Sequence, residues 1–543
     1  MHKRFSIFLI LLLSCLFPLS AHALELPQDG LPSLVISSDT PLQVINSDKA
    51  NRTTGHMELY DAFGQLICER EITSFHMRGA TSCYRQIEKK PYNMKLSLKA
   101  ELIPDAGKAK KWSLLSGDMY DEFVDWTHNN PLLLQILGFQ LYEDLGGKFS
   151  LGYMPVSLYD NDDYRGVYLL TEATNVGKNR VHIRDSIYDT PGSVIASETI
   201  EYLQQEIRIN YYQDAVLSGD SGGFLIELDS KTTESAWFET SWHHIYSFKE
   251  PKYPTREQII QIAEYVQNVE EALYSDSGFS REGKYFTEYL DMDSFIARLA
   301  VDEMLMNCDA FLKSCFFCID VDERGDFSTK LIAGPAWDYD GADLDSTDFL
   351  ANTGFLKQIV KHGEITARLY ELSMGELKDV WGSYLGEDGL FAAWVRCLTP
   401  AEQRNHERWP SSADFLGDVN TRLSASAFLR SLASRGSIWY SRILQENRLL
   451  GVTASWDDEK KTIVPTVYGS DDYTAEFCLV DSRGKLAPVD GTTLSPGSTY
   501  VVKVTNNDET ASLTDFTNQS YGSVVNGHPV GSVMFSNPVV CPE

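Results

Sequence analysis

The sequence NCDAFLKSCFF at residues 307–317, followed by WDYD at residues 337–340, decides the fold and the candidate site. An apolar helix is predicted to end at Met306, so Asp309 falls in the loop that follows it. A strand is predicted over residues 316–321, and a turn and a second short strand come after it. The WDYD stretch then forms a second acidic loop.

Two acidic loops, placed after a helix and after a strand pair, form the layout that phosphoryl transfer by kinases needs. In that layout one aspartate, here Asp309, accepts or orients the proton of the substrate hydroxyl. A polar residue five positions later, here Ser314, holds metal, and a second aspartate, Asp338 or Asp340, bridges Mg²⁺ to the nucleotide phosphates. The alternative is structural, because aspartates are common in caps and turns.

A kinase also needs a cation on a strand, usually beneath a glycine-containing loop. The sequence RGATS at residues 78–82 is typical of a turn, and KKPYNMKL at residues 89–96 is typical of a strand that carries lysines. This turn and strand fit the requirement. A solvated hairpin with surface lysines is the alternative.

The remaining pattern predicts an α+β core of about 430 residues and a small all-β tail. Thr255 and Gln258 form a capping box at the start of an amphipathic helix, and residues from 359 to about 449 are mostly helical. Other strands and helices are expected at residues 34–36, 42–45, 57–60, 92–98, 131–145, 154–158, 166–170, 222–228 and 294–306. Residues 450–543 alternate as β-strands between turn pairs such as Asp490-Gly491, which predicts a β-sandwich-like module.

Charge excludes several partners. The chain has 77 acidic and 47 basic residues in 543, which gives a net charge of -30. No basic excess exists to neutralise phosphates, so nucleic acid is a poor candidate partner, and so is an anionic membrane surface. Any phosphate site must therefore use a few placed cations, Mg²⁺ or backbone N–H groups.

The N-terminus predicts export. Lys3 and Arg4 precede an apolar run, and Ala21-His22-Ala23 is an A-x-A cleavage signal, so residues 1–23 are interpreted as a signal peptide. A lipoprotein anchor at Cys15 is the alternative, although the apolar run continues beyond it. The apolar run is too short to span a membrane, and no transmembrane segment is expected elsewhere.

Eight cysteines remain after the signal peptide, and an even number in an exported protein permits disulfides. Cys68–Cys83 and Cys478–Cys541 are plausible pairs on regional grounds. Cys308, Cys315 and Cys318 could instead suggest zinc, but no second cysteine or histidine pair has the required spacing.

Together these stretches resemble the spore-coat CotH-type atypical protein kinase family, over about residues 34–447. The family shows an RGNS-like turn, a KKPY-x-x-KL strand, a G-x-Y-x-L-x-E strand, a GG-x-x-x-ELD strand, a D-x-x-x-x-N loop and a WD-x-D loop. The matching stretches are Arg78-Gly79, residues 89–92 with 95–96, residues 166–172, residues 222–223 with 227–229, residues 252–254, residues 293–295, residues 337–340, Arg408-Trp409 and Arg435.

The resemblance implies a two-lobed, kinase-like fold over residues 24–449 and ATP-dependent phosphorylation of Ser or Thr on secreted or coat proteins. By motif, Asp309 is the catalytic aspartate, and Asp338 is the Mg²⁺ or Mn²⁺ ligand, with Asp340 a second possibility. Lys95 or Lys90 is the residue that contacts the ATP phosphates. Arg78 lies in the turn over the nucleotide. Glu172 ends a strand in the linker region, where it either contacts nucleotide or acts as a structural carboxylate.

Two departures from the family pattern leave an alternative open. The asparagine after the catalytic aspartate is Ser314 here, and Ala80 replaces the asparagine of the turn. A hydroxyl is a weaker Mg²⁺ ligand than a carboxamide oxygen. Both changes affect the nucleotide and metal end of the site. The alternative is therefore a pseudokinase, a scaffold or surface-binding protein with a kinase-like fold.

A metal-dependent glycosyltransferase is a third possibility, because Asp338-Tyr339-Asp340 is a D-x-D that could hold a nucleotide-sugar through Mn²⁺. This short pattern is common in proteins and leaves the other motifs unexplained.

Overall fold

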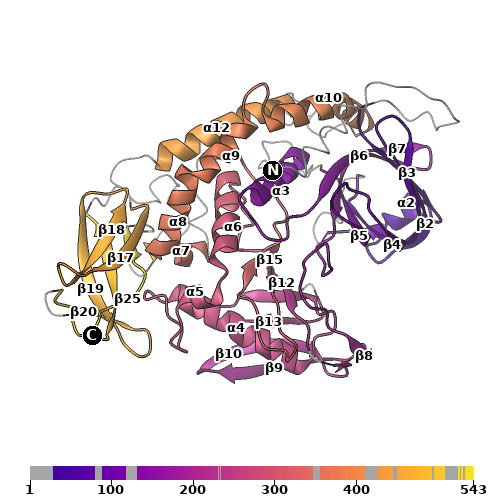
Figure 1. Cartoon of the computed structure of the whole chain (residues 1–543). Helices are drawn as coiled ribbons and strands as arrows, with labels where there is room; N and C mark the ends of the chain where they lie inside the picture. The colour runs from indigo at the N-terminus through magenta and orange to yellow at the C-terminus, as the bar shows by residue number, and fades with distance from the viewer. Residues whose placement is uncertain are drawn as a thin grey trace.

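A closed barrel, a seven-stranded sheet with its helices, and a group of C-terminal strands follow one another along the chain (Figure 1). This mixture of mainly antiparallel strands and helices agrees with the expected α+β class. The computed structural model describes residues 29–79, 89–117, 131–219, 221–229, 232, 234–346, 355–409, 425–443, 449–491, 494–507, 524–525, 528–529 and 532–543. The predicted signal peptide, Cys15, Ala80 and Cys83 lie outside these residues.

Seven strands close into the barrel in the order β1-β2-β3-β4-β5-β7-β6. Parallel pairing of β1 with β6 closes it, and every other pair is antiparallel. Along β4 Tyr92, Met94 and Leu96 fill the interior while Lys95 is exposed, as strand periodicity requires. The strands are β1 (Ser33–Ser38), β2 (Thr53–Tyr60), β3 (Leu66–Met77), β4 (Tyr92–Ala100), β5 (Ala109–Leu115), β6 (Tyr153–Asp160) and β7 (Asp163–Glu172).

One predicted strand is wrong. Residues Leu42–Ile45 form the short helix α2 and not a β-strand. Pro41 precedes the helix with a φ of -53°, and Leu42 and Ile45 are both buried at a spacing of three residues. Four residues are too few to separate helical from strand periodicity in sequence.

The second sheet has the order β16-β15-β12-β14-β13-β10-β9, and all its neighbouring strands are antiparallel. Strands β8 (Tyr188–Thr190) and β11 (Val216–Leu217) form a separate two-stranded sheet. In the chain, β8 precedes β9 and β11 follows β10. The sheet strands are β9 (Ile195–Tyr202), β10 (Gln205–Tyr212), β12 (Phe224–Asp229), β13 (Trp237–Glu239), β14 (Ile245–Glu250), β15 (Cys315–Ile319) and β16 (Ile332–Ala333).

Two apolar clusters cover the faces of this sheet. Helix α4 (Arg256–Tyr274) buries Ile259, Ile262 and Val266 in the first cluster, and its predicted capping box is confirmed, with both Thr255–Gln258 hydrogen bonds formed. Helix α3 (Pro131–Asp144) belongs to the second cluster, and α6 (Met292–Leu305) contributes to both. The short α5 (Phe286–Tyr289) precedes α6.

The last helices run along one side of the molecule, from the C-terminal strands to the barrel (Figure 1). Near the end of α10, the Asn405 Oδ1 atom accepts hydrogen bonds from Lys89 Nζ and from the Val167 backbone N–H, both at 2.9 Å. This helix therefore ties the barrel to the rest of the chain. The helices are α7 (Leu356–Ile359), α8 (Gly363–Met374), α9 (Glu376–Tyr384), α10 (Leu390–Arg408) and α12 (Ala425–Ile443).

The C-terminal strands gather around their own apolar cluster, which includes Val452, Tyr500 and Val502. They pack on α8: the Phe535 N–H donates to the Lys361 carbonyl at 2.9 Å. The assignment of residues 450–543 to a separate domain stays a prediction. The strands are β17 (Gly451–Asp457), β18 (Thr462–Tyr468), β19 (Tyr473–Val480), β20 (Leu486–Val489), β21 (Thr499–Asn506), β22 (Val524–Val525), β23 (His528–Pro529), β24 (Val533–Phe535) and β25 (Val539–Val540).

The cysteines of the described residues are free thiols, so the expected Cys478–Cys541 bridge is not formed. Cys478 pairs with Val501 on one face of its sheet, whereas Cys541 packs in the cluster on the other face. The zinc alternative is also wrong, because Cys315 and Cys318 point to opposite faces of β15 and enter different apolar clusters.

None of the helices in the described part of the chain is long and apolar enough to cross a membrane.

Candidate active site

The loop that follows α6 carries Asp309 on an unusual backbone. Met306, Phe311 and Ser314 have φ angles of 51°, 54° and 54°, and Asp338 in the second acidic loop has 67°. Residues other than glycine rarely adopt positive φ, and such residues concentrate at functional sites. Four of the eleven non-glycine residues with positive φ in the described part of the chain therefore lie at these two loops, and the other seven lie elsewhere.

Asp309 is half-buried and close to other charges. Its Oδ1 lies 3.1 Å from Lys313 Nζ. Burial raises the pKa of Asp309, Lys313 lowers it, and the charge of Asp338 raises it again. Asp309 and Asp338 are thus near enough for electrostatic repulsion, as a shared phosphoryl-transfer site requires.

The second acidic loop, residues 337–340, alternates between buried aromatic rings and partly exposed carboxylates. Tyr339 is fully buried and packs edge-on against Phe139 of α3, with ring centroids 6.3 Å apart. A Cβ atom on Gly138 of α3 would overlap the Tyr339 ring, so only glycine fits there. Asp338 and Asp340, which alternate with these rings, are half-buried.

Hydrogen bonds join the two loops directly. The Asp343 N–H donates to the Leu305 carbonyl at 3.0 Å, where α6 ends. The Cys308 thiol donates to the Gly341 carbonyl at 3.4 Å. The position of Asp309 is thereby linked to that of Asp338 and Asp340.

A buried charged network supports both loops from below. Arg298 Nε on α6 donates to Asp302 Oδ2 at 2.6 Å, and Asn307 Nδ2 donates to Asp302 Oδ1 at 3.2 Å. The Arg298 guanidinium also lies 5.7 Å from the centre of the Tyr339 ring. One network therefore contacts the start of the Asp309 loop and the core of the Asp338 loop.

Arg435 of α12 fixes the end of α6. This buried side chain donates to the carbonyls of Met304, Glu303 and Ser346 at 2.7, 2.6 and 2.7 Å. The last carbonyls of a helix have no partner within the helix, and a cation there is favourable. Arg435 belonged to the family resemblance, and its contacts give it a structural role beneath the site.

The barrel contributes Arg78 from the end of β3. Its guanidinium lies 4.9 Å from the centre of the Trp337 ring. Burial lowers the pKa of Arg78, while the carboxylates of Asp338, Asp340 and Glu227 raise it. The structure thus brings Arg78 together with the second acidic loop, as the motif order suggested.

Glu227, Asp229 and Lys249 were missed as site residues. Lys249 Nζ on β14 lies 2.6 Å from Glu227 Oε2 on β12. Burial raises the pKa of Glu227, Lys249 lowers it, and Asp229 and Asp338 raise it. The ELD stretch of the family pattern, residues 227–229, could have identified the two acidic residues from sequence. Only the folded sheet shows that Glu227 lies near enough to Asp338 to interact with its charge.

The two lysines proposed for phosphate contact lie in different surroundings. Lys90 is buried, and its carbonyl accepts a hydrogen bond from the Tyr168 hydroxyl at 3.0 Å. Lys95 is exposed on the outer face of β4, directly opposite the exposed Lys111 of β5. Like charges directly opposite each other on a sheet repel, so Lys95 and Lys111 do not stabilise each other there.

Glu172 is held in a buried ion pair with Arg180. Its Oε2 atom also accepts a hydrogen bond from the Gly152 N–H at 2.6 Å. Arg180 in turn lies 4.8 Å from the centre of the Trp112 ring. These contacts favour the structural interpretation of Glu172 in the connection after the barrel.

The acidic loops offer a suitable donor set for Mg²⁺ or Mn²⁺. Asp338 and Asp340 supply carboxylate oxygens, and the half-buried Ser314 supplies a hydroxyl. Among the described residues, His56, Glu58 and Glu69 on the barrel form a group of three histidine, cysteine or carboxylate ligand atoms within 4.8 Å of one another, and Asp309, Asp338 and Asp340 do not.

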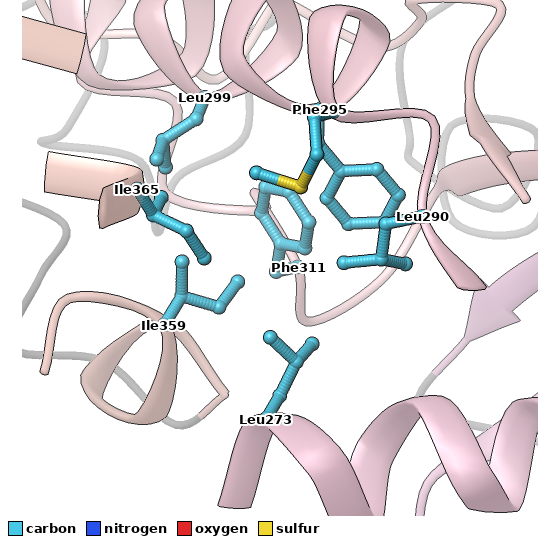
Figure 2. A pocket seen from close by; sticks show the side chains of 8 residues that line it. Leu273, Leu290, Phe295, Leu299, Phe311, Ile359 and Ile365 are labelled. Carbon is cyan, nitrogen blue, oxygen red and sulfur yellow. The ribbon is translucent and has the colours of Figure 1, made fainter. Parts of the chain in front are cut away.

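An apolar cavity lies beneath the Asp309 loop (Figure 2). Figure 2 shows Phe311 of the loop facing Phe295 and Leu299 of α6 and Ile359 of α7. Its lining carries no polar side chain, so this cavity supports the loop and does not suit a nucleotide. The complete lining is Leu273, Leu290, Met292, Phe295, Leu299, Phe311, Ile359 and Ile365.

Comparison with protein-family models identifies the lineage of the chain. Residues 75–371 match the family described as CotH kinase protein, which is more than half of the chain. The matched segment includes Arg78, Asp309, Asp338 and Asp340. The protein therefore belongs to the CotH kinase family. No curated protein matches the chain.

Proposed function

We propose that the protein is an exported atypical kinase that transfers the γ-phosphate of ATP to Ser or Thr hydroxyls of secreted or surface proteins. The observation that carries this proposal is that Asp309 and Asp338 lie near enough to interact electrostatically, and that Arg78 of the barrel packs on Trp337 beside Asp338. The barrel and the seven-stranded sheet would then be the two lobes of a kinase-like fold. Residues 24–449 would form this domain, and residues 450–543 an appended module.

The proposed roles follow the chemistry of each side chain. Asp309 accepts or orients the proton of the attacking hydroxyl, which is the role of an aspartate in this position. Asp338, Asp340 and Ser314 would hold Mg²⁺ or Mn²⁺, which neutralises charge on the nucleotide phosphates when bound. Arg78, together with Lys95 or Lys90, would supply the positive charge that the phosphates of ATP require, since the net charge of the chain is -30 and offers no general basic excess.

The substrate class follows from the predicted signal peptide at residues 1–23. Export would place the protein with secreted, periplasmic or surface proteins. The net charge of -30 supports a protein acceptor over nucleic acid or an anionic membrane.

The test is phosphate transfer from radiolabelled ATP by the mature chain, residues 24–543, to an exported-protein extract and to itself. Asp309→Asn should lower the rate about 10²- to 10⁴-fold, the usual contribution of a positioned acid or base. Asp458→Asn is the control, because Asp458 is an exposed carboxylate on the turn between β17 and β18. Equal rates in wild type and Asp309→Asn would refute the role of Asp309.

Ser314 motivates one alternative, a pseudokinase that acts as a scaffold. A thermal-shift titration with ATP and Mg²⁺ or Mn²⁺ separates the two functions, because a ligand that binds only the native state stabilises it by RT ln(1 + [L]/Kd). At a hundredfold excess over Kd the gain is about 2.7 kcal/mol. A metal-dependent shift that Asp338→Ala abolishes supports the kinase, provided that phosphate transfer is also measured. The absence of any shift at millimolar ATP favours the scaffold.

A further inference from the structure

Lys313 brings a positive charge into the space between the two acidic loops. Its Nζ atom lies 3.1 Å from Asp309 Oδ1, and its side chain is 47% exposed. Asp309 and then Asp338 are the carboxylates that act most strongly on this ammonium group. Lys313 therefore pairs with Asp309, is near enough to Asp338 to interact with its charge, and remains accessible to a ligand.

The residue next to Lys313 is Ser314, where the kinase layout has a metal-binding asparagine. A serine side chain is shorter than that of asparagine, and its hydroxyl is a weaker ligand for a hard cation than a carboxamide oxygen. Its backbone is already in the left-handed region, with a φ of 54°. Ser314 is thus a weaker metal ligand than the asparagine of the kinase layout, whereas the neighbouring Lys313 brings a positive charge beside Asp309.

We propose that the Lys313 ammonium group takes the place of a second metal ion and binds the γ-phosphate of the nucleotide directly. This inference rests on the proposed kinase function. One divalent ion at Asp338 and Asp340 then suffices, because Lys313 supplies the remaining positive charge. Lysine is well suited to this role, since its ammonium group binds phosphate as a compact point charge.

A purely local role for Lys313 is the competing explanation. An exposed ion pair at a spacing of four residues contributes little to stability, typically below about 1 kcal/mol. Lys460 offers a matched case, since it pairs with Asp457 at 3.2 Å and is 68% exposed on the turn after β17. If Lys313 serves only its own loop, the two lysines will behave alike in every nucleotide measurement.

The experiment measures ATP affinity of the mature chain by calorimetry and thermal shift, at increasing free Mg²⁺ above the level that converts ATP to its magnesium complex. Wild type, Lys313→Met, Lys313→Arg, Lys460→Met and the double variant Lys313→Met with Ser314→Asn are compared. We expect Lys313→Met to weaken ATP binding about tenfold, and Lys313→Arg and Lys460→Met to change it little. The ATP affinity of the double variant should rise with the free Mg²⁺ concentration, and a plot of log affinity against log free Mg²⁺ should have a slope near one. For the wild type the same plot should have a slope near zero.

Each outcome decides between the possibilities. Equal ATP affinity in Lys313→Met and Lys460→Met overturns the role of Lys313 and leaves the kinase proposal standing. A slope near one for the wild type, in the plot of log ATP affinity against log free Mg²⁺, also overturns the role of Lys313 and leaves the kinase proposal standing. Such a slope reveals a second metal ion beside Lys313. Failure of wild type to bind ATP at all overturns the kinase proposal and the role of Lys313 together.

Discussion

Two ion pairs with the same four-residue spacing lie next to each other in the chain, and they differ in almost every physical respect. Arg298 and Asp302 are 3% and 0% exposed, 2.6 Å apart, and tied to Asn307 as well. Asp309 and Lys313 are 21% and 47% exposed and 3.1 Å apart. The first pair fixes the loops, and the second is open to a ligand. Burial and partners, and not spacing, separate structural charges from functional ones.

The largest effect is expected from breaking the buried pair. Asp302→Ala leaves the Arg298 guanidinium buried without its carboxylate, and such a loss costs about 3–5 kcal/mol of unfolding free energy. Urea denaturation of the mature chain measures it. Asp309→Ala is the comparison and should change stability by less than about 1 kcal/mol. Similar losses in the two variants would contradict the distinction between the pairs.

An intermediate effect is expected where α3 meets the second acidic loop. Gly138→Ala places a methyl group against the ring of Tyr339, and overpacking of this kind costs about 1–3 kcal/mol. The displaced Tyr339 should carry Asp338 and Asp340 with it, so metal-dependent ATP binding should fall as well. Thermal unfolding with and without ATP measures both consequences.

Gly382→Ala is the matched control for this substitution. Gly382 lies within α9, and a Cβ atom there would meet nothing within 4 Å. Alanine is favoured over glycine in a helix by roughly 0.5–1 kcal/mol, so this variant should be slightly more stable. If Gly138→Ala were as stable as Gly382→Ala, the packing of Tyr339 would not control the loop.

The smallest effect is expected at the exposed pair. Lys313→Met should change the unfolding free energy by about 0.5 kcal/mol or less, because a partly exposed ion pair is screened by solvent. Chemical denaturation beside Lys460→Met checks this value. A loss that approaches that of Asp302→Ala would show that Lys313 has a structural role.

Local signals in the sequence predicted local structure well. The capping box at Thr255 and Gln258 formed as expected because its partners are three residues apart. Asp309 and Asp338 could be brought together from sequence because an ordered set of motifs surrounds them. In contrast, the four residues of α2 carried too little periodicity to identify a helix.

Contacts that the folded chain creates without a local sequence pattern could not be predicted. Glu172 and Arg180 form a buried ion pair that no local pattern indicates. Glu227 and Lys249 meet only because β12 and β14 pair in the sheet. Barrel closure likewise rests on the parallel pairing of β1 with β6, more than a hundred residues away. The sequence therefore named the loops of the site, whereas the fold was needed to show what surrounds them.

The attachment of the barrel has a consequence for motion. The barrel is joined to the sheet through α3, whose residue Tyr142 donates to the Ala333 carbonyl at 2.8 Å, and through the connection after Glu172. Asn405 of α10 holds it at a third place. Arg78 of the barrel also packs on Trp337 of the second acidic loop, so contacts at several places oppose a swing of the barrel on a single hinge. We therefore expect the rates of ligand admission and release at the candidate site to follow the dynamics of short loops and not the relative rotation of two large bodies.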